Sequence, residues 1–462
     1  MAGASPPGHA CPVRKPTVGK KHRTLQRTAE QPHGTTGASP GGPIPVAAPK
    51  GPSIRIAATA ASSVQRASGS AHHPGMRKLE SWFYAPPVFS ITAEPKMPVI
   101  EATASIVGLT TGPDPTRWTE FEWTATVSFN SKNCPYGVVK KAHTFGKRVL
   151  KVGDTRTIPA ITTGSQKVVG GKIVARFDQI RGGTLTISVT AKVGGITLKG
   201  ETKGWRIQGT NPSKSEVGKA LPDDTHRKIA CAESTMEQFC RAKGEGNAWY
   251  PKFSGDTYLG IGICQLTDPR AEDDQVWDWR ENVKAGVDLY DKKKEEASNY
   301  PGLVARSPKF LAAVRRYNEL RLLENDSHVF AMPGTPAPAG GETAAGPVPV
   351  SVEVSVPEFT DDQLEDDTIR GFNGWGGHDA FGHSLHEFRI QQDPATKDLV
   401  VDGDPNTGKV SAKWERVPVS ARPGHGDPNY VRDVKNRDPK TCKVRRAVLG
   451  DFPAASGTTA SA

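Results

Sequence analysis

The chain has 462 residues, enough for two or three domains, and a formal net charge of +11. It contains no run of about 18 apolar residues, so we expect no membrane span. The positive charge favours an anionic partner and, among the bacterial wall, nucleic acid and lipid headgroups, does not choose one.

The N-terminal segment of residues 1–75 is rich in Pro, Gly, Ser, Ala, Lys and Arg, with almost no aromatics. It cannot bury enough apolar surface to offset its ordering entropy, so we predict a disordered basic arm. Because the arm lacks interleaved aromatic residues, nucleic acid is not the expected partner. The first residues also lack the apolar core of a secretory signal. We therefore expect a protein made in the cytoplasm without a signal peptide.

A period of two dominates residues 96–209, where we predict a β-sandwich. The stretch 184–200 alternates apolar and polar residues around Gly194-Gly195, which indicates a hairpin. Further strands are predicted over 120–129 and 172–177. We find no catalytic constellation in this region. A wall-binding or docking role and a plain spacer both stay open.

A mainly helical catalytic domain is predicted over 210–390, with an insertion at about 325–360. Its first residues, 210–217, are predicted to be a linker and a clean domain boundary. Helices are predicted over 225–243, 277–290 and 361–371, and a strand over 351–356. Residues 391–450 are predicted to form a C-terminal extension of strands and loops. The expected fold class is therefore multidomain α+β.

The six cysteines show neither a CxxC pair nor zinc-type spacing with His. In a helix over 225–243, Cys231 and Cys240 would lie about 13 Å apart, too far to bridge. We therefore interpret the cysteines mainly as small buried apolar residues, while a structural disulfide elsewhere stays open. His383 and His386 lack the spacing of a zinc helix, so no metal is expected.

One carboxylate stands out within the predicted helix over 225–243. Glu233 follows Ile229 by four residues and precedes Met236 by three, so it projects from nearly the same apolar stripe. A carboxylate turned towards apolar surroundings loses hydration, which raises its pKa, as a general acid near neutral pH requires. The alternative is a Glu at the edge of the stripe that reaches solvent or pairs with Arg227 or Lys228.

Two further segments accompany Glu233-Ser234. Gly262-Ile263-Cys264-Gln265 is an apolar turn that ends in a polar residue, and Asn282-Val283 with Gly286 lies on the predicted helix over 277–290. In this order the segments resemble three motifs of the soluble lytic transglycosylases and goose-type lysozymes, with Ile and Cys where the family has Leu and Met. The resemblance covers about residues 223–377 and implies a lysozyme-like domain with Glu233 as its catalytic residue.

The family's fourth motif is Ala-Tyr-Asn followed by glycine, and its Tyr lies close to the catalytic Glu. Phe372-Asn373 is the preferred match, although Phe replaces Tyr. Tyr317-Asn318 is the competing match, without the glycine. With Phe372 in this place, a phenol that orients Glu233 is missing, and the positioning must come from elsewhere. Ser234, Gln265, Phe372, Asn373 and Tyr317 are the expected substrate-binding residues.

The resemblance implies cleavage of peptidoglycan glycan strands by a single Glu, with no cofactor. Glu233 would protonate the bridging oxygen and then, as a base, activate water or the sugar's C6 hydroxyl, giving hydrolytic or 1,6-anhydro ends. Gln265 and Asn373 would hydrogen-bond the sugar N-acetyl groups. Asp256 and Asp268 are candidate second carboxylates, and each also suits a turn.

Chains that join a sandwich, this core and a tail like 372–374 with 386–389 resemble effectors of contractile injection systems such as type VI secretion. This implies action in the periplasm or cell wall of a target cell after delivery by dedicated machinery. The implied partners are peptidoglycan, secretion-machinery components and a cognate immunity protein. A phage lysin and a non-catalytic wall-binding module on a lysozyme-like scaffold are the alternatives.

Overall fold

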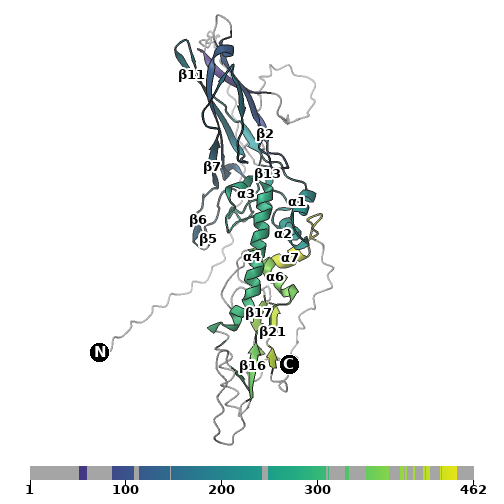
Figure 1. The fold of residues 1–462 in the computed structure, drawn as a ribbon. Coiled ribbons are helices and arrows are strands. Elements are labelled where there is room, and N and C mark those ends of the chain that lie inside the picture. The colour runs from purple at the N-terminus through teal and green to yellow at the C-terminus, as the bar shows by residue number, and fades with distance from the viewer. Residues whose placement is uncertain are drawn as a thin grey trace, which may run out of the picture. The chain divides into compact units, whose positions relative to one another are not determined.

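The computed structural model describes residues 51–59, 86–108, 114–145, 147–241, 248–308, 311, 328–331, 350–373, 386–389, 391–392, 399–400, 409–411, 413–416, 427 and 429–444. The chain divides into two units, Met1–Lys50 and Gly51–Ala462, and all described residues belong to the second. They form a mixed α+β fold (Figure 1), which confirms the expected fold class at this level.

Two sheets share the N-terminal part of this unit. The smaller is antiparallel, in the order β1 (Ser53–Ala58), β3 (Ile100–Val107), β9 (Lys172–Ala175). The larger has the order β2 (Val88–Ser90), β12 (Arg206–Gln208), β10 (Gly183–Val193), β4 (Glu120–Asn130), β7 (Thr157–Thr162). β11 (Ile196–Glu201) pairs with β10, and β8 (Gln166–Val169) pairs with β4. Shorter elements are η1 (Pro115–Trp118), η2 (Ser131–Asn133), β5 (His143–Phe145) and β6 (Arg148–Leu150).

The period of two in the sequence explains how the sheets pack. Ile100 and Ile173 of the smaller sheet and Phe121 and Ile187 of the larger one are fully buried in a single core. Side chains of alternate residues point to opposite faces of a strand, so the apolar set faces inward. The predicted hairpin around Gly194-Gly195 is confirmed as the antiparallel pair β10–β11.

The predicted disordered arm over 1–75 is wrong for part of its length, because Ser53–Ala58 forms β1. This strand pairs with β3 from Ser53–Val107 to Ala58–Ala102, and Ile54 and Ile56 pack against the core. The reason is a local alternation of apolar residues within a polar segment, which a sheet edge can bury. The sheets therefore begin before residue 96.

The helical part consists of α1 (Lys214–Ala220), α2 (Asp224–Ser234), α3 (Asp273–Trp277), α4 (Trp279–Ala305), α6 (Asp361–Phe372) and α7 (Tyr430–Lys435). Strands in the same part are β13 (Phe239–Arg241), β14 (Trp249–Pro251), β15 (His328–Ala331), β16 (Val350–Ser355), β17 (His386–Arg389), β18 (Gln391–Gln392), β19 (Leu399–Val400), β20 (Lys409–Ser411) and β21 (Lys413–Arg416). α6 lies against α4, and α7 lies against both α2 and α6 (Figure 1). Over the described residues, we find no helix with both the length and the apolar character needed to cross a bilayer.

The predicted helix over 225–243 is only half as long in the structure. Asp223 caps its start by accepting a hydrogen bond from the His226 backbone at 2.9 Å. It ends at Ser234, because Thr235 and Met236 both take left-handed backbone conformations, with φ of 60° and 61°. The chain therefore turns sharply immediately after Glu233-Ser234.

The predicted linker over 210–217 is not a clean boundary. Asn211 bonds both backbone groups of Phe239, at 2.8 and 2.9 Å, and α1 already begins at Lys214. Trp277 of α3 is fully buried, with its ring 5.3 Å from that of Phe129 in β4. Sheets and helices therefore share one core, which period analysis of each part separately does not detect.

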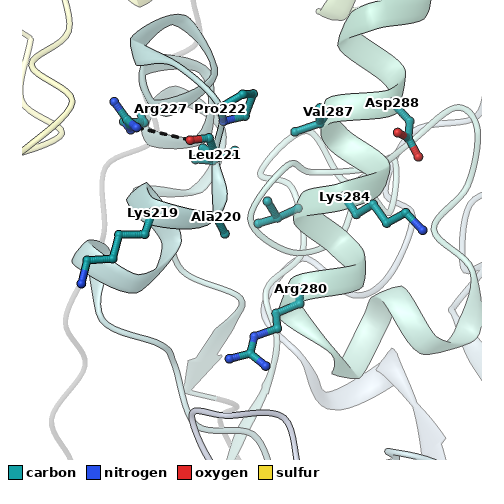
Figure 2. Close-up of a pocket in the computed structure, with 10 residues that line it drawn as sticks. Lys219, Ala220, Leu221, Pro222, Arg227, Arg280, Lys284, Val287 and Asp288 are labelled. Atoms are coloured by element: carbon teal, nitrogen blue, oxygen red, sulfur yellow. Dashed lines mark hydrogen bonds between the residues drawn. The ribbon is translucent and has the colours of Figure 1, made fainter.

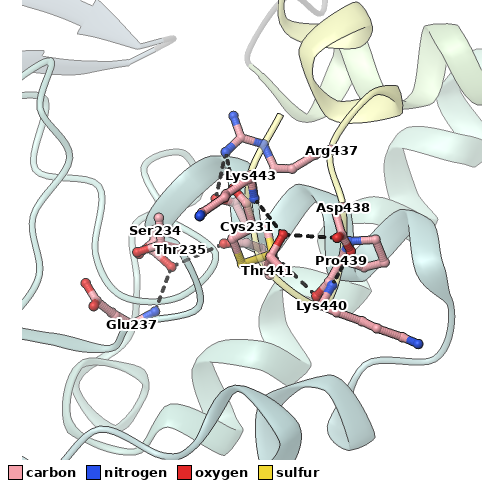
Figure 3. Close-up of a disulfide and its surroundings, with 12 residues drawn as sticks. Cys231, Ser234, Thr235, Glu237, Arg437, Asp438, Pro439, Lys440, Thr441 and Lys443 are labelled. Atoms are coloured by element: carbon pink, nitrogen blue, oxygen red, sulfur yellow. Dashed lines mark hydrogen bonds between the residues drawn. A yellow bond between two sulfur atoms is a disulfide. The ribbon is translucent and has the colours of Figure 1, made fainter. Parts of the chain in front are cut away.

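The C-terminal boundary at residue 390 is also wrong. Tyr430, Val431 and Val434 of α7 are buried in one apolar cluster with residues of α2, α4 and α6. A disulfide joins Cys231 in α2 to Cys442 (Figure 3), so for this pair the open alternative of a structural disulfide applies instead of the interpretation as small apolar residues. The segment around α7 belongs to the helical domain rather than to a separate extension.

Candidate active site

Glu233 lies in the last turn of α2 and is half-buried. Its Oε1 accepts a hydrogen bond from the hydroxyl of Tyr430 in α7. Burial among protein atoms raises the pKa of Glu233 from 4.5 to about 7, and the Tyr430 hydrogen bond opposes this rise. The carboxyl group is thus largely protonated below neutral pH, as a general acid needs.

An apolar cluster from four helices holds Tyr430 beside Glu233. Its buried members are Ile229 from α2, Tyr290 from α4, Ile369 from α6, and Tyr430, Val431 and Val434 from α7. Ala232 and Phe372 pack against it and are partly exposed. Desolvation, followed by the nearby charge of Glu233, raises the pKa of Tyr430 well above 10. Tyr430 therefore remains a hydrogen-bond donor at any physiological pH.

Two charged groups outside α2 also act on Glu233. The carboxylate of Asp256 raises the pKa of Glu233, and the guanidinium of Arg437 lowers it. Asp256 is held in its loop by hydrogen bonds from the Ser254 hydroxyl at 2.5 Å and the Tyr258 backbone at 2.9 Å. Of the two candidate second carboxylates, Asp256 is thus the one whose charge acts on Glu233. Its side chain also accepts hydrogen bonds within a turn.

Ser234 fastens the end of α2 to the second motif. Its hydroxyl donates to the carbonyl of Ile263 at 2.8 Å and accepts from the Glu237 backbone at 3.2 Å. The ammonium of Lys252 binds the Ser234 carbonyl at 2.6 Å and the Glu237 carboxylate at 2.7 Å. Ser234 is itself 2% exposed, so its role in the structure is positioning the turn rather than presenting a group to solvent.

Buried amides fix the loop that carries the second motif. Gln238 accepts from the backbone of Ile263 at 3.1 Å, and Asn282 accepts from the backbone of Cys264 at 3.0 Å. Asn282 also donates to the Ile261 carbonyl at 3.0 Å. Gly262 has a φ of 82°, and a Cβ there would lie 2.5 Å from both amides. The Gly and the Asn of the recognised motifs are therefore explained by packing.

The expected sugar-binding residue Gln265 lies in this loop with a φ of 47°. Its amide nitrogen donates to the Gly262 carbonyl at 2.6 Å, which leaves its Oε1 buried and without a hydrogen-bond partner. The neighbouring Cys264 is buried, and desolvation raises the pKa of its thiol to about 12, so it stays a thiol. Gln265 can bind a sugar amide only where Oε1 becomes accessible.

The candidates for the fourth motif lie in different places. Phe372 ends α6 and packs beside Tyr430, whereas Asn373 is the C-cap of α6, its backbone bonded to Arg370 and Ile369. Tyr317 lies outside the described residues. The expectation that a phenol is missing at Glu233 is wrong, because Tyr430 supplies it from a segment not considered for this role.

The one local signal for Tyr430 is the spacing of Tyr430, Val431 and Val434, which gives a short apolar helix face in 429–435. The signal for Cys442 is its polar context, RDPKTCKVRR, which does not resemble that of a buried core thiol. Neither pattern indicates a partner on α2. Both contacts depend on residues roughly two hundred positions away in the chain.

A hollow of about 470 Å³ lies between α4 and the end of α1 with the turn that follows it (Figure 2). Cationic side chains surround apolar ones: Lys219, Arg227, Arg280 and Lys284 with Ala220, Leu221, Val283 and Val287. Arg227 is committed to the Gly218 carbonyl at 2.8 Å and the Asp224 carboxylate at 2.8 Å. α2 contributes only Arg227, near its start, to this lining, whereas Glu233 lies near the end of that helix.

Among the described side chains, no group of three His, Cys, Asp or Glu residues could hold a metal ion. His383 lies outside the described residues. A comparison of the chain with protein-family models, curated proteins and solved structures finds no match. The functional interpretation therefore rests on the residues of the site themselves.

Proposed function

We propose that the protein cleaves the glycan strands of peptidoglycan, with Glu233 as the one catalytic carboxyl group. The observation that carries the proposal is the carboxyl group of Glu233, with a pKa of about 7 and a phenol donor on one of its oxygens. Such a group is protonated near neutral pH and can transfer its proton to a bridging oxygen. The order of the Glu-Ser, Gly-x-x-Gln and Asn-Val motifs supports the lysozyme-like form of this reaction.

In the proposed reaction, the proton moves from Glu233 to the glycosidic oxygen as the bond from that oxygen to the sugar carbon breaks. Because Tyr430 donates to Oε1, the transferable proton resides on Oε2. The carboxylate so formed then removes a proton from water or from the C6 hydroxyl. The oxygen that loses this proton bonds to the sugar carbon at the broken bond. Asp256 is the group best placed by charge to assist the water route. The site needs no cofactor for either route.

Digestion of purified peptidoglycan followed by mass spectrometry tests this proposal. We expect new glycan ends with the wild-type chain, reducing or 1,6-anhydro, which differ by one water. Glu233→Gln keeps the Oε1 acceptor for Tyr430 but has no proton to give, so activity should fall about a hundred- to ten-thousand-fold. Glu295→Gln, at an exposed position on α4, is the matched control and should stay active. Unchanged cleavage by Glu233→Gln would remove this assignment.

We further propose that the protein acts in the periplasm or cell wall of a target cell after delivery by a contractile injection system. The sheets of residues 51–208, interpreted as a β-sandwich, are the proposed docking part. The alternative setting is that of a phage lysin, which would cleave the same substrate. Expression in the bacterial cytoplasm should be nearly harmless, and fusion to a secretory signal should cause lysis that Glu233→Gln abolishes. Lysis by the unfused form would contradict this setting.

A further inference from the structure

The disulfide connects the two sides of the candidate active site. Cys231 lies in α2, two residues before Glu233, and Cys442 follows Tyr430 after one short helix and one turn. Two backbone hydrogen bonds close the turn (Figure 3). The Asp438 N–H donates to the Lys443 carbonyl at 2.9 Å, and the Cys442 N–H donates to the Asp438 carbonyl at 2.8 Å. Arg437 adds a hydrogen bond to the Cys442 carbonyl at 3.0 Å. The covalent bond is therefore linked to Tyr430 through a short, ordered segment.

Without this bond, noncovalent contacts alone would hold the segment on the domain. α7 has only 6 residues, too few to be a stable helix alone. Its noncovalent attachments include the buried side chains of Tyr430, Val431 and Val434, the Tyr430 hydrogen bond to Glu233 and the Arg437 hydrogen bond to the Cys231 carbonyl at 3.5 Å. Lys435 adds ion pairs to α6, at 2.6 Å to Asp362 and 2.5 Å to Asp366. The pair with Asp362 is largely exposed and contributes little, whereas the Asp366 side chain is 6% exposed. Loss of the disulfide would leave the docked position of Tyr430 to these noncovalent contacts of a short segment.

We propose that the Cys231–Cys442 disulfide is a redox-sensitive tether, which completes the Glu233 site by holding Tyr430 on it. The inference rests on the function proposed above. In a reducing compartment both cysteines are thiols, and the segment carrying Tyr430 leaves Glu233 for much of the time. In an oxidising compartment a disulfide oxidant, such as oxidised glutathione or a protein disulfide, accepts the two electrons. The two thiols form one disulfide, and the oxidant becomes two thiols.

The burial of the sulfur atoms gives the tether a direction. Cys231 is fully buried and Cys442 is 6% exposed in the oxidised fold. Thiol–disulfide exchange needs access of a thiolate to one sulfur, so the formed tether resists small thiols. The bond can form readily while the segment is undocked. A chain made in a reducing cytoplasm would therefore gain activity on reaching an oxidising space and then keep it.

The test compares the full chain refolded in two ways, with a thiol reductant or with oxidised glutathione. Acid stops thiol–disulfide exchange in both forms, and buffer exchange then removes the excess reagent. Both forms are assayed on purified peptidoglycan. We expect the oxidised form to be more active by about tenfold or more, since a long loop closed by a disulfide shifts the docking equilibrium at least that far. Cys442→Ser should match the reduced form under both conditions. Cys240→Ser, a half-buried cysteine outside the pair, should keep the full difference.

A second measurement distinguishes a disulfide that positions Tyr430 from one that only stabilises the domain as a whole. Tyr430→Phe should reduce activity in the oxidised chain but have little further effect in Cys442→Ser, because the phenol is already displaced there. Hydrogen exchange in the reduced form should rise over 429–442 and remain unchanged in α4. Equal activity of the two refolded forms, additive effects of the two substitutions, or increased exchange throughout α4 would each overturn the proposal. Inactivity of the oxidised wild-type chain would instead refute the proposed function, and the exchange pattern would still decide on the tether.

Discussion

The sheets of residues 51–208 and the helical region of 209–444 differ in which residues adopt left-handed backbone. Among the described residues of the sheets, these positions are nine glycines and Tyr136. In the helical region they are Gly262 and six residues with side chains: Thr235, Met236, Thr257, Leu259, Gln265 and Cys442. Left-handed backbone costs energy for residues with a Cβ, so it persists only where the surroundings enforce it.

The enforced turns of the helical region lie on the segments that surround Glu233. Thr235 and Met236 turn the chain after Glu233, and Gln265 ends the loop that the Ser234 hydroxyl binds. The sheets follow the local preferences of their sequence, with glycine at the turns and alternating apolar residues within strands. The contrast shows that the turns of the sheets follow local backbone preferences, whereas those around Glu233 are enforced by their surroundings.

The largest effect is expected where the two regions meet. Trp277→Ala should lower the free energy of unfolding by about 3–5 kcal/mol, because it empties a site packed against Phe129, Phe239 and Gly182. Chemical denaturation followed by signals from both regions should show one shifted transition. Trp118→Ala, at a residue 79% exposed, is the control and should have little effect. Two separate transitions would restore the clean boundary at 210–217.

Within the helical region, Tyr430→Phe should lower wall-cleaving activity about tenfold to a hundredfold, since it removes a hydrogen bond to a charged group. The Tyr430 bond lowers the pKa of Glu233, so the variant should have a higher pKa. The decline of activity on the alkaline side should therefore move to higher pH. The pH–rate profile of the purified variant measures this shift. A displacement to lower pH would contradict the role of Tyr430.

The titration of Glu233 should also appear in stability. Its pKa is about 7 when folded against 4.5 in an unfolded chain, so the folded form binds the proton more tightly. Its contribution is fully present below pH 4.5 and is lost as the pH rises through 7. We expect a decline of about 1–3 kcal/mol between pH 4.5 and 8 that Glu233→Gln does not share. Denaturation of both chains at the two pH values measures the difference.

The smallest effect is expected for Asp256→Asn. The negative charge of Asp256 raises the pKa of Glu233, and removing it should move the alkaline decline of activity to lower pH by less than about one unit. If Asp256 assists the water route, the ratio of hydrolytic to 1,6-anhydro ends should also fall. The pH profile and mass spectrometry of the products separate the two roles. An unchanged profile with unchanged products would leave Asp256 as a turn residue.

The sequence by itself determined the regular elements and the position of Glu233 on an apolar stripe. The strands over 120–129 and 184–200 and the helix over 361–371 appear close to their predicted bounds, and the helix predicted over 277–290 begins at Trp279 but continues to Ala305. These features depend on periodicities within a few residues, which local sequence carries directly. The raised pKa of Glu233 follows from the same pattern, because a side chain on an apolar stripe is desolvated by whatever packs there.

Only the tertiary structure decided where α2 ends, that Tyr430 binds Glu233, and that Cys231 pairs with Cys442. The helix end depends on Ser234 bonding the loop of Ile263, and the other two contacts join α2 to the far end of the chain. Contacts over such separations form because the whole core brings the segments together, and no local propensity encodes them. For the same reason the sequence did not show that Trp277 packs on Phe129 across the boundary predicted at 210–217.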